Sequence, residues 1–255
     1  MTSLPITSRS DVDPLLDDLL HAFLDLAERS IRERGVFRVA LSGGSTPKRL
    51  YERIADSGLD WSRVHWFWGD ERNVPADDPE SNYRMVREAM LVPAAVPPEN
   101  VFAVPVQVDD PAAAALRYEQ TLRECFVAAA VVETPPAGFD SPAPRFPHWD
   151  LVLLGLGDDA HTASLFPQSP ALDIRDAWFV ANWVEKFSAF RYTLTFPAIN
   201  SAREIWFLIT GAAKREAMGR LLSGEKEPHL YPAQAIRPTR FFVTDDALPT
   251  ARPHR

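Results

Sequence analysis

The sequence predicts an α/β fold, in which a doubly wound and mainly parallel sheet carries helices on both faces. The apolar run that follows Asp150 stops at Gly155, and such a run is typical of a strand buried on both faces. Similar runs alternate along the chain with segments of helical periodicity, and strands joined by crossover helices form parallel sheets. Because 255 residues are within the range of one α/β unit, we expect a single α/β domain over residues 1–255.

The first half of the chain begins with a long amphipathic helix. Asp13 can cap this helix, Pro14 fits its first turn, and apolar residues follow at helical spacing up to Ile31. Runs of apolar, aromatic and β-branched residues between turn residues then predict strands, and serine is a common helix cap. We expect, in order, a strand at 37–41, a turn at 42–47, a helix carrying Leu50, Tyr51 and Ile54, a strand at 64–68, a loop at 69–79 and a helix capped by Ser81.

The second half continues the same alternation of strands and helices. A stretch at about 134–147 contains five prolines. We interpret it as a surface loop and not as a domain boundary, because the same alternation of strands and helices continues on both sides of it. Apolar runs and helical periodicity define the remaining elements. We expect strands at 101–104, 150–154, 178–184, 191–195, 204–210 and 240–244, and helices at about 111–130 and at 212–222.

Composition limits the partners of the chain. A net charge of -8 and a pI near 5.3 argue against nucleic acid and anionic membranes, so an anionic substrate needs a local cluster of Arg and Lys. The single cysteine, Cys125, has no internal disulfide partner, which indicates a reducing compartment. No leader pattern and no long apolar span are present, so we expect a cytoplasmic protein without a membrane partner.

A glycine turn between a strand and a helix is the first candidate site. Ser42, Gly43 and Gly44 allow close approach of a ligand to the backbone, and the N–H groups of a helix start favour a phosphate monoester. The turn matches neither nucleotide-binding glycine pattern. The alternative is a tight structural turn with Thr46 as helix cap and Pro47 at the first helical position.

A second candidate follows the next strand. Asp70, Glu71 and Arg72 form an acid pair beside a cation, which could orient sugar hydroxyls and an anion. The alternative is a surface ion pair, which contributes only about 0–1 kcal/mol. Ser81, Asn82 and Tyr83 are best explained as a helix start, with Asn82 as a possible ligand contact.

The third candidate is a histidine just past the 150–154 strand. His161 follows two glycines and two acids, and ligands of open α/β sheets collect at the carboxyl ends of the strands. The nearby acids could fix the tautomer of the imidazole and raise its basicity, and either Asp159 or a neighbouring backbone carbonyl could orient the ring. The other histidines lack metal-ligand spacing, so we expect neither a metal nor another cofactor.

Three cations form the last group: Lys186, Arg191 and Lys214. Lys214 lies in the opening turn of a helix, where a cation opposes the helix dipole unless an anionic ligand compensates; the alternative is a solvated lysine. The chain lacks the Gly-x-Ser-x-Gly nucleophile motif, and its cysteine lies in a helical pattern. These observations favour general-base chemistry on a small phosphorylated molecule.

Four segments together resemble the 6-phosphogluconolactonase family, and they cover roughly residues 38–220. They are Ser-Gly-Gly-Ser-Thr-Pro at 42–47, Trp-Gly-Asp-Glu-Arg at 68–72 with Asp78-x-x-Ser-Asn-Tyr83, Gly-Leu-Gly-Asp-Asp-Ala-His-Thr-Ala-Ser-Leu-Phe-Pro at 155–167, and Arg-Tyr-Thr-Leu-Thr at 191–195 with Ile199-Asn200. The chain departs from the family pattern at Ala160, where the family usually has glycine, and after Lys186, where it often has prolines.

The resemblance implies hydrolysis of 6-phosphoglucono-1,5-lactone in the oxidative pentose phosphate pathway. It implies that His161 is the catalytic base and that the 42–44 turn, Arg191 and Lys214 bind the phosphate, with Arg72 and Lys186 as further substrate contacts. Two other functions stay open. An amino-sugar-phosphate deaminase and isomerase shares the fold and uses an acid at the Asp70 position, and a non-catalytic sugar-phosphate sensor would use the same cations.

Overall fold

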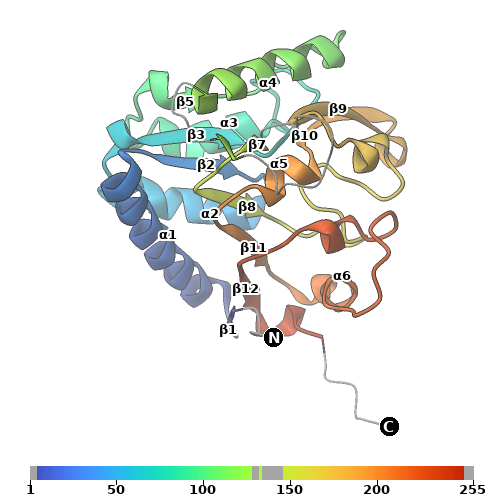
Figure 1. Cartoon of the computed structure of the whole chain (residues 1–255). Helices are drawn as coiled ribbons and strands as arrows, with labels where there is room; N and C mark the ends of the chain where they lie inside the picture. The colour runs from blue at the N-terminus through green and yellow to red at the C-terminus, as the bar shows by residue number, and fades with distance from the viewer. Residues whose placement is uncertain (1–4, 128–131, 134–145, 250–255) are drawn as a thin grey trace.

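A seven-stranded parallel sheet forms the centre of the computed structural model, which describes residues 5–127, 132–133 and 146–249 (Figure 1). All six strand pairings in this sheet are parallel, which confirms the predicted fold class. The strands lie in the order β1 (Ile6–Arg9), β12 (Arg240–Thr244), β11 (Ile205–Ile209), β8 (Leu151–Leu154), β2 (Phe37–Leu41), β3 (Val64–Trp68) and β5 (Val101–Phe102).

Helices cover both faces of the sheet, as predicted. The ring of Phe23 from α1 stacks on Trp66 of β3, whereas Phe126 from α4 contacts the next residue of that strand, Phe67. Neighbouring strand residues point to opposite faces, so α1 and α4 lie on opposite sides of the sheet. The helices are α1 (Val12–Arg34), α2 (Ser45–Ala55), α3 (Asn82–Val86), α4 (Pro111–Val127), α5 (Phe196–Asn200) and α6 (Arg215–Leu221).

A second, antiparallel sheet corrects part of the predicted topology. The expected strands at 178–184 and 191–195 form a hairpin, β9 (Phe179–Val184) and β10 (Ala189–Leu194), outside the main sheet. Part of the expected 69–79 loop is a third strand, β4 (Asp70–Arg72), which pairs with β10. Strand β4 is short and all of its residues are charged, so it lacks the alternation of apolar and polar residues that predicts a strand.

Other differences are local. Strand β1 was not predicted because its residues, Ile-Thr-Ser-Arg, are mostly polar and form an edge. The last predicted helix begins as a 3-10 turn at Ala212–Lys214. Of the proline-rich stretch, residues 134–145 lie outside the described part of the chain, and Phe146–Pro147 (β7) pairs with Val132–Glu133 (β6). Within the described ranges, no helix is long and apolar enough to cross a membrane.

The parallel arrangement places several loops at one edge of the sheet. Strands β2, β8 and β3 end at Leu41, Leu154 and Trp68, and each is followed at once by one of the predicted site segments. Parallel strands point their carboxyl ends the same way, so these segments lie next to one another.

Candidate functional site

A cavity of about 310 Å³ opens where these loops meet. Most of the residues predicted from the sequence line it, and they come from four separate segments. They are Ser42, Gly43, Gly44, Asp70, Arg72, His161 and Lys214. Asp159, Lys186 and Arg191 are not among its lining residues. Asp159 contacts His161, Arg191 pairs with Arg72 across two strands, and Lys186 contacts Asp159.

The glycine turn presents the start of α2 to the cavity. Gly44 has a φ of 113°, in a region that favours glycine, and no side chain caps the helix that starts at Ser45. The alternative interpretation made Thr46 the cap, but its hydroxyl bonds to the hydroxyl of Thr210 at 2.8 Å instead. The N-terminus of α2 therefore keeps the partial positive charge that favours an anion.

Tyr51 supports this turn through hydrogen bonds to the backbone of Ser42, a role that the sequence pattern did not reveal. Its hydroxyl donates to the carbonyl oxygen of Ser42 at 2.7 Å and accepts from the N–H of Ser42 at 3.0 Å. Tyr51 is buried on the apolar face of α2, where helical periodicity predicts only a core residue.

Replacing Tyr51 with phenylalanine is therefore expected to weaken the turn. The change leaves the buried N–H and C=O of Ser42 without their partner, which should lower the free energy of unfolding by about 1–3 kcal/mol. Denaturant unfolding measures this loss. An unchanged midpoint would show that the hydroxyl does not support the turn.

The two acids that follow β3 have opposite environments. Asp70 lines the cavity, whereas Glu71 is only 1% exposed and points into the protein. The Glu71 carboxylate accepts from the N–H groups of Arg72 at 2.8 Å, Asn82 at 2.7 Å and Tyr83 at 2.7 Å. Glu71 thus caps the first turn of α3 and is a structural residue. Burial raises its pKa, which these backbone hydrogen bonds oppose.

Asp70 has a single side-chain donor among the described residues. The hydroxyl of Ser164, which is 2% exposed, donates to Asp70 Oδ2 at 2.9 Å. Burial raises the pKa of Asp70, and the charge of Arg72 opposes the rise. The Asp70 carboxyl is therefore held in place at the wall of the cavity by a buried hydrogen bond.

His161 lies at the rim of the cavity, and its imidazole is oriented on two sides. Its Nδ1 lies 2.5 Å from Asp159 Oδ1, and its ring stacks on Phe166 with centroids 4.0 Å apart. The other carboxylate oxygen of Asp159 accepts from Lys186 Nζ at 3.0 Å. Burial raises the pKa of Asp159, but the bonds and charges of His161 and Lys186 outweigh this and hold it well below its usual range.

The backbone before His161 adopts a tight turn. Ala160 has a φ of 58°, in the left-handed region, and its N–H donates to the carbonyl of Gly157. The imidazole then folds back over Gly157, where a Cβ would lie 2.0 Å from His161 Nδ1. A residue with a Cβ thus occupies the position at which the family usually has glycine, and the turn still forms.

The remaining cations approach from two elements. Lys214 Nζ contacts Asp158 Oδ1 at 2.5 Å, so an internal acid already partners the lysine that the sequence left uncompensated. Arg191 lies opposite Arg72 in the β10–β4 pairing, and its guanidinium is 5.3 Å from the ring centroid of Phe187. Burial and the like charge of Arg72 lower the pKa of Arg191.

Replacing Asp158 with asparagine is expected to strengthen anion binding, because it removes the acid that competes for Lys214. Asp158 is 71% exposed, so the effect on KM should be modest, a decrease of up to about fivefold, with kcat unchanged. Asp173→Asn is the matched control, since Asp173 is equally exposed and pairs with His229 rather than with a residue of the cavity. Equal KM values for both variants would contradict the competition.

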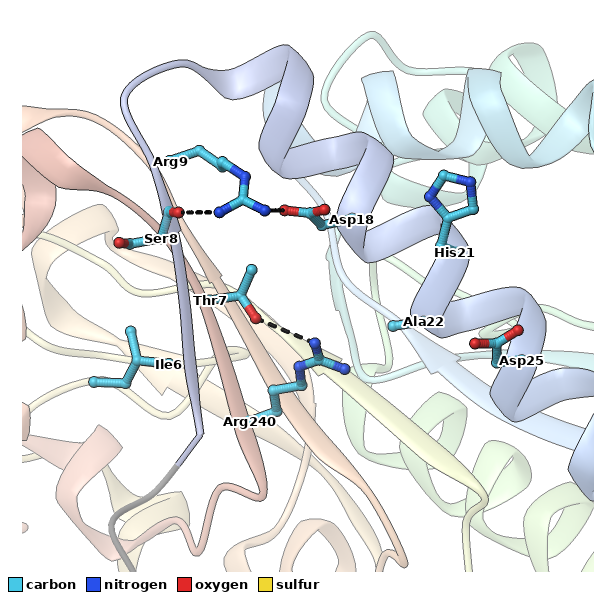
Figure 2. Close-up of a pocket in the computed structure, with 9 residues that line it drawn as sticks. All are labelled: Ile6, Thr7, Ser8, Arg9, Asp18, His21, Ala22, Asp25 and Arg240. Carbon is cyan, nitrogen blue, oxygen red and sulfur yellow. Dashed lines mark hydrogen bonds and ion pairs between the residues drawn. The ribbon is translucent and has the colours of Figure 1, made fainter.

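A larger groove elsewhere is less suited to chemistry. Figure 2 shows it between β1 and α1, with a volume of about 620 Å³. None of the site residues predicted from the sequence lines it, and its arginines contact other groups of the same groove: Arg9 pairs with Asp18 and Arg240 donates to Thr7. Across the described ranges, no group of three or more His, Cys, Asp or Glu is arranged to hold a metal ion. The cavity at the strand ends therefore stays the candidate site.

Comparison with known proteins identifies relatives that match most of the chain. Residues 10–244 match the family model described as glucosamine-6-phosphate isomerases/6-phosphogluconolactonase. The 6-phosphogluconolactonase of Synechocystis sp. is 43% identical over 210 residues, which are 82% of this chain and 81% of that protein. The enzyme of Nostoc sp. is 41% identical over 228 residues, 89% of each chain. The structure of 6-phosphogluconolactonase from Trypanosoma cruzi superimposes with a TM-score of 0.83 at 27% identity, covering 96% of this chain and 95% of that one.

Proposed function

Because the chain belongs to the 6-phosphogluconolactonase family, we propose that it hydrolyses 6-phosphoglucono-1,5-lactone to 6-phosphogluconate with His161 as general base. One observation carries the proposal. The imidazole of His161, oriented by Asp159, lies in the same cavity as the glycine turn, Arg72 and Lys214. One cavity of about 310 Å³ thus contains both a base and an anion-binding site, as a sugar phosphate substrate requires.

The proposed reaction begins with proton removal from water. In the tautomer in which Nδ1–H donates to Asp159, Nε2 of His161 carries a lone pair that can accept a proton. The oxygen of that water forms a bond to the lactone carbonyl carbon as the proton moves to Nε2. A base of this type supplies about 10²–10⁴ in rate.

Collapse of the tetrahedral intermediate completes the reaction. The bond between the carbonyl carbon and the ring oxygen breaks, and the imidazolium returns its proton to that oxygen. The new carboxylic acid then loses its proton to solvent. No covalent enzyme intermediate is needed, which agrees with the absence of a nucleophile motif in the sequence.

The charges of the cavity have separate tasks in this proposal. The 42–44 turn at the start of α2 and Lys214, which line the cavity, bind the phosphate together with Arg191, which lies opposite Arg72 in the strand pairing. Arg72 contacts the lactone end, where a cation stabilises the developing oxyanion by about 3–4 kcal/mol. Asp70 accepts a hydrogen bond from a sugar hydroxyl, and Lys186 holds Asp159 in place.

The deaminase alternative differs in its product. The family model that matches the chain covers both activities, but the relatives at 43% and 41% identity are named as lactonases. We therefore expect no ammonia release from glucosamine 6-phosphate.

A turnover assay tests the proposal. Freshly generated phosphogluconolactone is followed with and without the protein, and the rate of spontaneous opening is subtracted. A rate above the spontaneous one supports lactonase activity. Ammonia release from glucosamine 6-phosphate would support the deaminase, and binding without turnover of either compound would support the sugar-phosphate sensor.

A further inference from the structure

Asn82 lies where the glycine turn, Arg72 and the end of β4 meet. Its side chain is 1% exposed. The amide oxygen Oδ1 accepts from Arg72 Nη1 at 2.6 Å, and the amide nitrogen donates to the carbonyl of Asp70 at 3.0 Å. Its backbone N–H donates to Glu71, which fixes Asn82 as the first residue of α3. The side chain is thus anchored from two directions.

The same amide touches the glycine turn. A Cβ added to Gly43 would lie 1.9 Å from Asn82 Oδ1 and 2.5 Å from its Cγ. The Asn82 amide therefore fills the space that a side chain at residue 43 would need, so only glycine fits there. The distance between the backbone of the turn and the guanidinium of Arg72 is set by one planar amide between them.

The hydrogen bond between Asn82 and Arg72 also determines which N–H groups of Arg72 stay available to a ligand. Nη1 donates to Asn82 Oδ1 and to the carbonyl of Glu80 at 2.7 Å, which uses both of its hydrogens. In the described part of the chain, no acceptor is found for Nη2 or Nε. Arg72 is thus oriented by neutral acceptors, and its charge stays available in the cavity.

We propose that Asn82 is a positioning residue, which spaces the guanidinium of Arg72 from the Ser42–Gly44 turn so that one substrate bridges them. This inference rests on the proposed function, in which the turn binds the phosphate and Arg72 the lactone end. An acid at this position would neutralise Arg72, and an alanine would leave it held by the carbonyl of Glu80 alone. Asn82 therefore acts through Arg72 and the turn without touching the reacting atoms.

Two ligands of different reach test the spacing. 6-Phosphogluconate spans both anchors, whereas inorganic phosphate occupies the turn alone. Asn82→Ala is expected to raise the Kd of 6-phosphogluconate roughly tenfold, the usual effect of losing a hydrogen bond to a charged group, and to change the Kd of phosphate less than twofold. Equal weakening of both ligands would show that Asn82 merely holds the turn together and would overturn the proposal.

Asn100→Ala is the matched control. Asn100 is a buried asparagine whose amide donates to the carbonyl of Trp61 at 2.9 Å, and it does not line the cavity. The Asn100→Ala substitution should lower the unfolding midpoint without changing the ratio of the Kd of 6-phosphogluconate to the Kd of phosphate. A changed ratio in this variant would also overturn the proposal, since the ratio would then report general destabilisation.

A double-mutant cycle gives an independent readout. Gly43→Ala alone should reduce kcat/KM at least 100-fold, because its methyl group overlaps the Asn82 amide. Gly43→Ala with Asn82→Ala removes the overlapping atoms and should be no worse than Asn82→Ala. Additive losses would contradict the contact. Failure of the proposed function is seen separately, as absent lactone turnover by the unmodified protein.

Discussion

His161→Asn is expected to lower kcat by about 10²–10⁴-fold, the contribution of a positioned general base. Asparagine can keep a hydrogen bond to Asp159, but it has no group that accepts a proton near neutral pH. Substrate affinity should change little, because the glycine turn and Lys214 are untouched. Steady-state kinetics, corrected for spontaneous opening of the lactone, separate the two parameters.

His229→Asn provides a control with the same chemistry. His229 also faces an aspartate, with Nε2 3.5 Å from Asp173 Oδ1, but it is 61% exposed and does not line the cavity. Its replacement should leave kcat unchanged. If the His161 variant stayed folded and kept most of its activity, the base would have to be another residue.

Gly157→Ala should also have a large effect. The added methyl group would overlap the imidazole, at 2.0 Å from Nδ1 and 2.1 Å from Cε1 of His161. The ring must then leave Asp159 and move relative to the substrate, and a misplacement of about 1 Å can cost 10²-fold in rate. We expect kcat/KM to fall by about that factor, measured beside the unfolding midpoint.

Gly155→Ala separates this effect from a general cost of replacing glycine. Gly155 precedes Gly157 by two residues, and an added Cβ at Gly155 would meet nothing within 4 Å. Because Gly155 also lines the cavity, its methyl group can change KM, but kcat should stay nearly unchanged. Equal losses in both variants would indicate that the loop backbone, and not the imidazole, is disturbed.

Much of the fold follows from local patterns in the sequence. The apolar runs predict the interior strands of the parallel sheet because both of their faces are buried. Strands β1 and β4 lack this signal, since each is short and polar and is held by pairing with a distant partner. The separate β9–β10 sheet could not be predicted either, because periodicity identifies a strand but not its neighbours.

The candidate site shows the same division. Glycine turns and charged residues past strand ends predict which residues gather, because parallel strands end at one edge. Sequence alone does not reveal that Glu71 points away from Asp70, or that Lys186 binds Asp159 and Lys214 binds Asp158. Tyr51 was missed as a support of the site because an apolar helix face explains it equally well. Asn82 was interpreted mainly as part of a helix start, with a ligand contact as the alternative, and its contact with Arg72 was not predicted.

The left-handed alanine before His161 affects the conformational freedom of the loop at 155–161. Ala160 is 1% exposed, and its carbonyl accepts from the N–H of Ala233 at 2.9 Å. Glycine would reach the same φ at lower energy, but it would also visit many more backbone states. The methyl group restricts these excursions, so less conformational entropy is lost when a bound molecule meets the imidazole. Local strain at one residue thus makes the histidine more rigid.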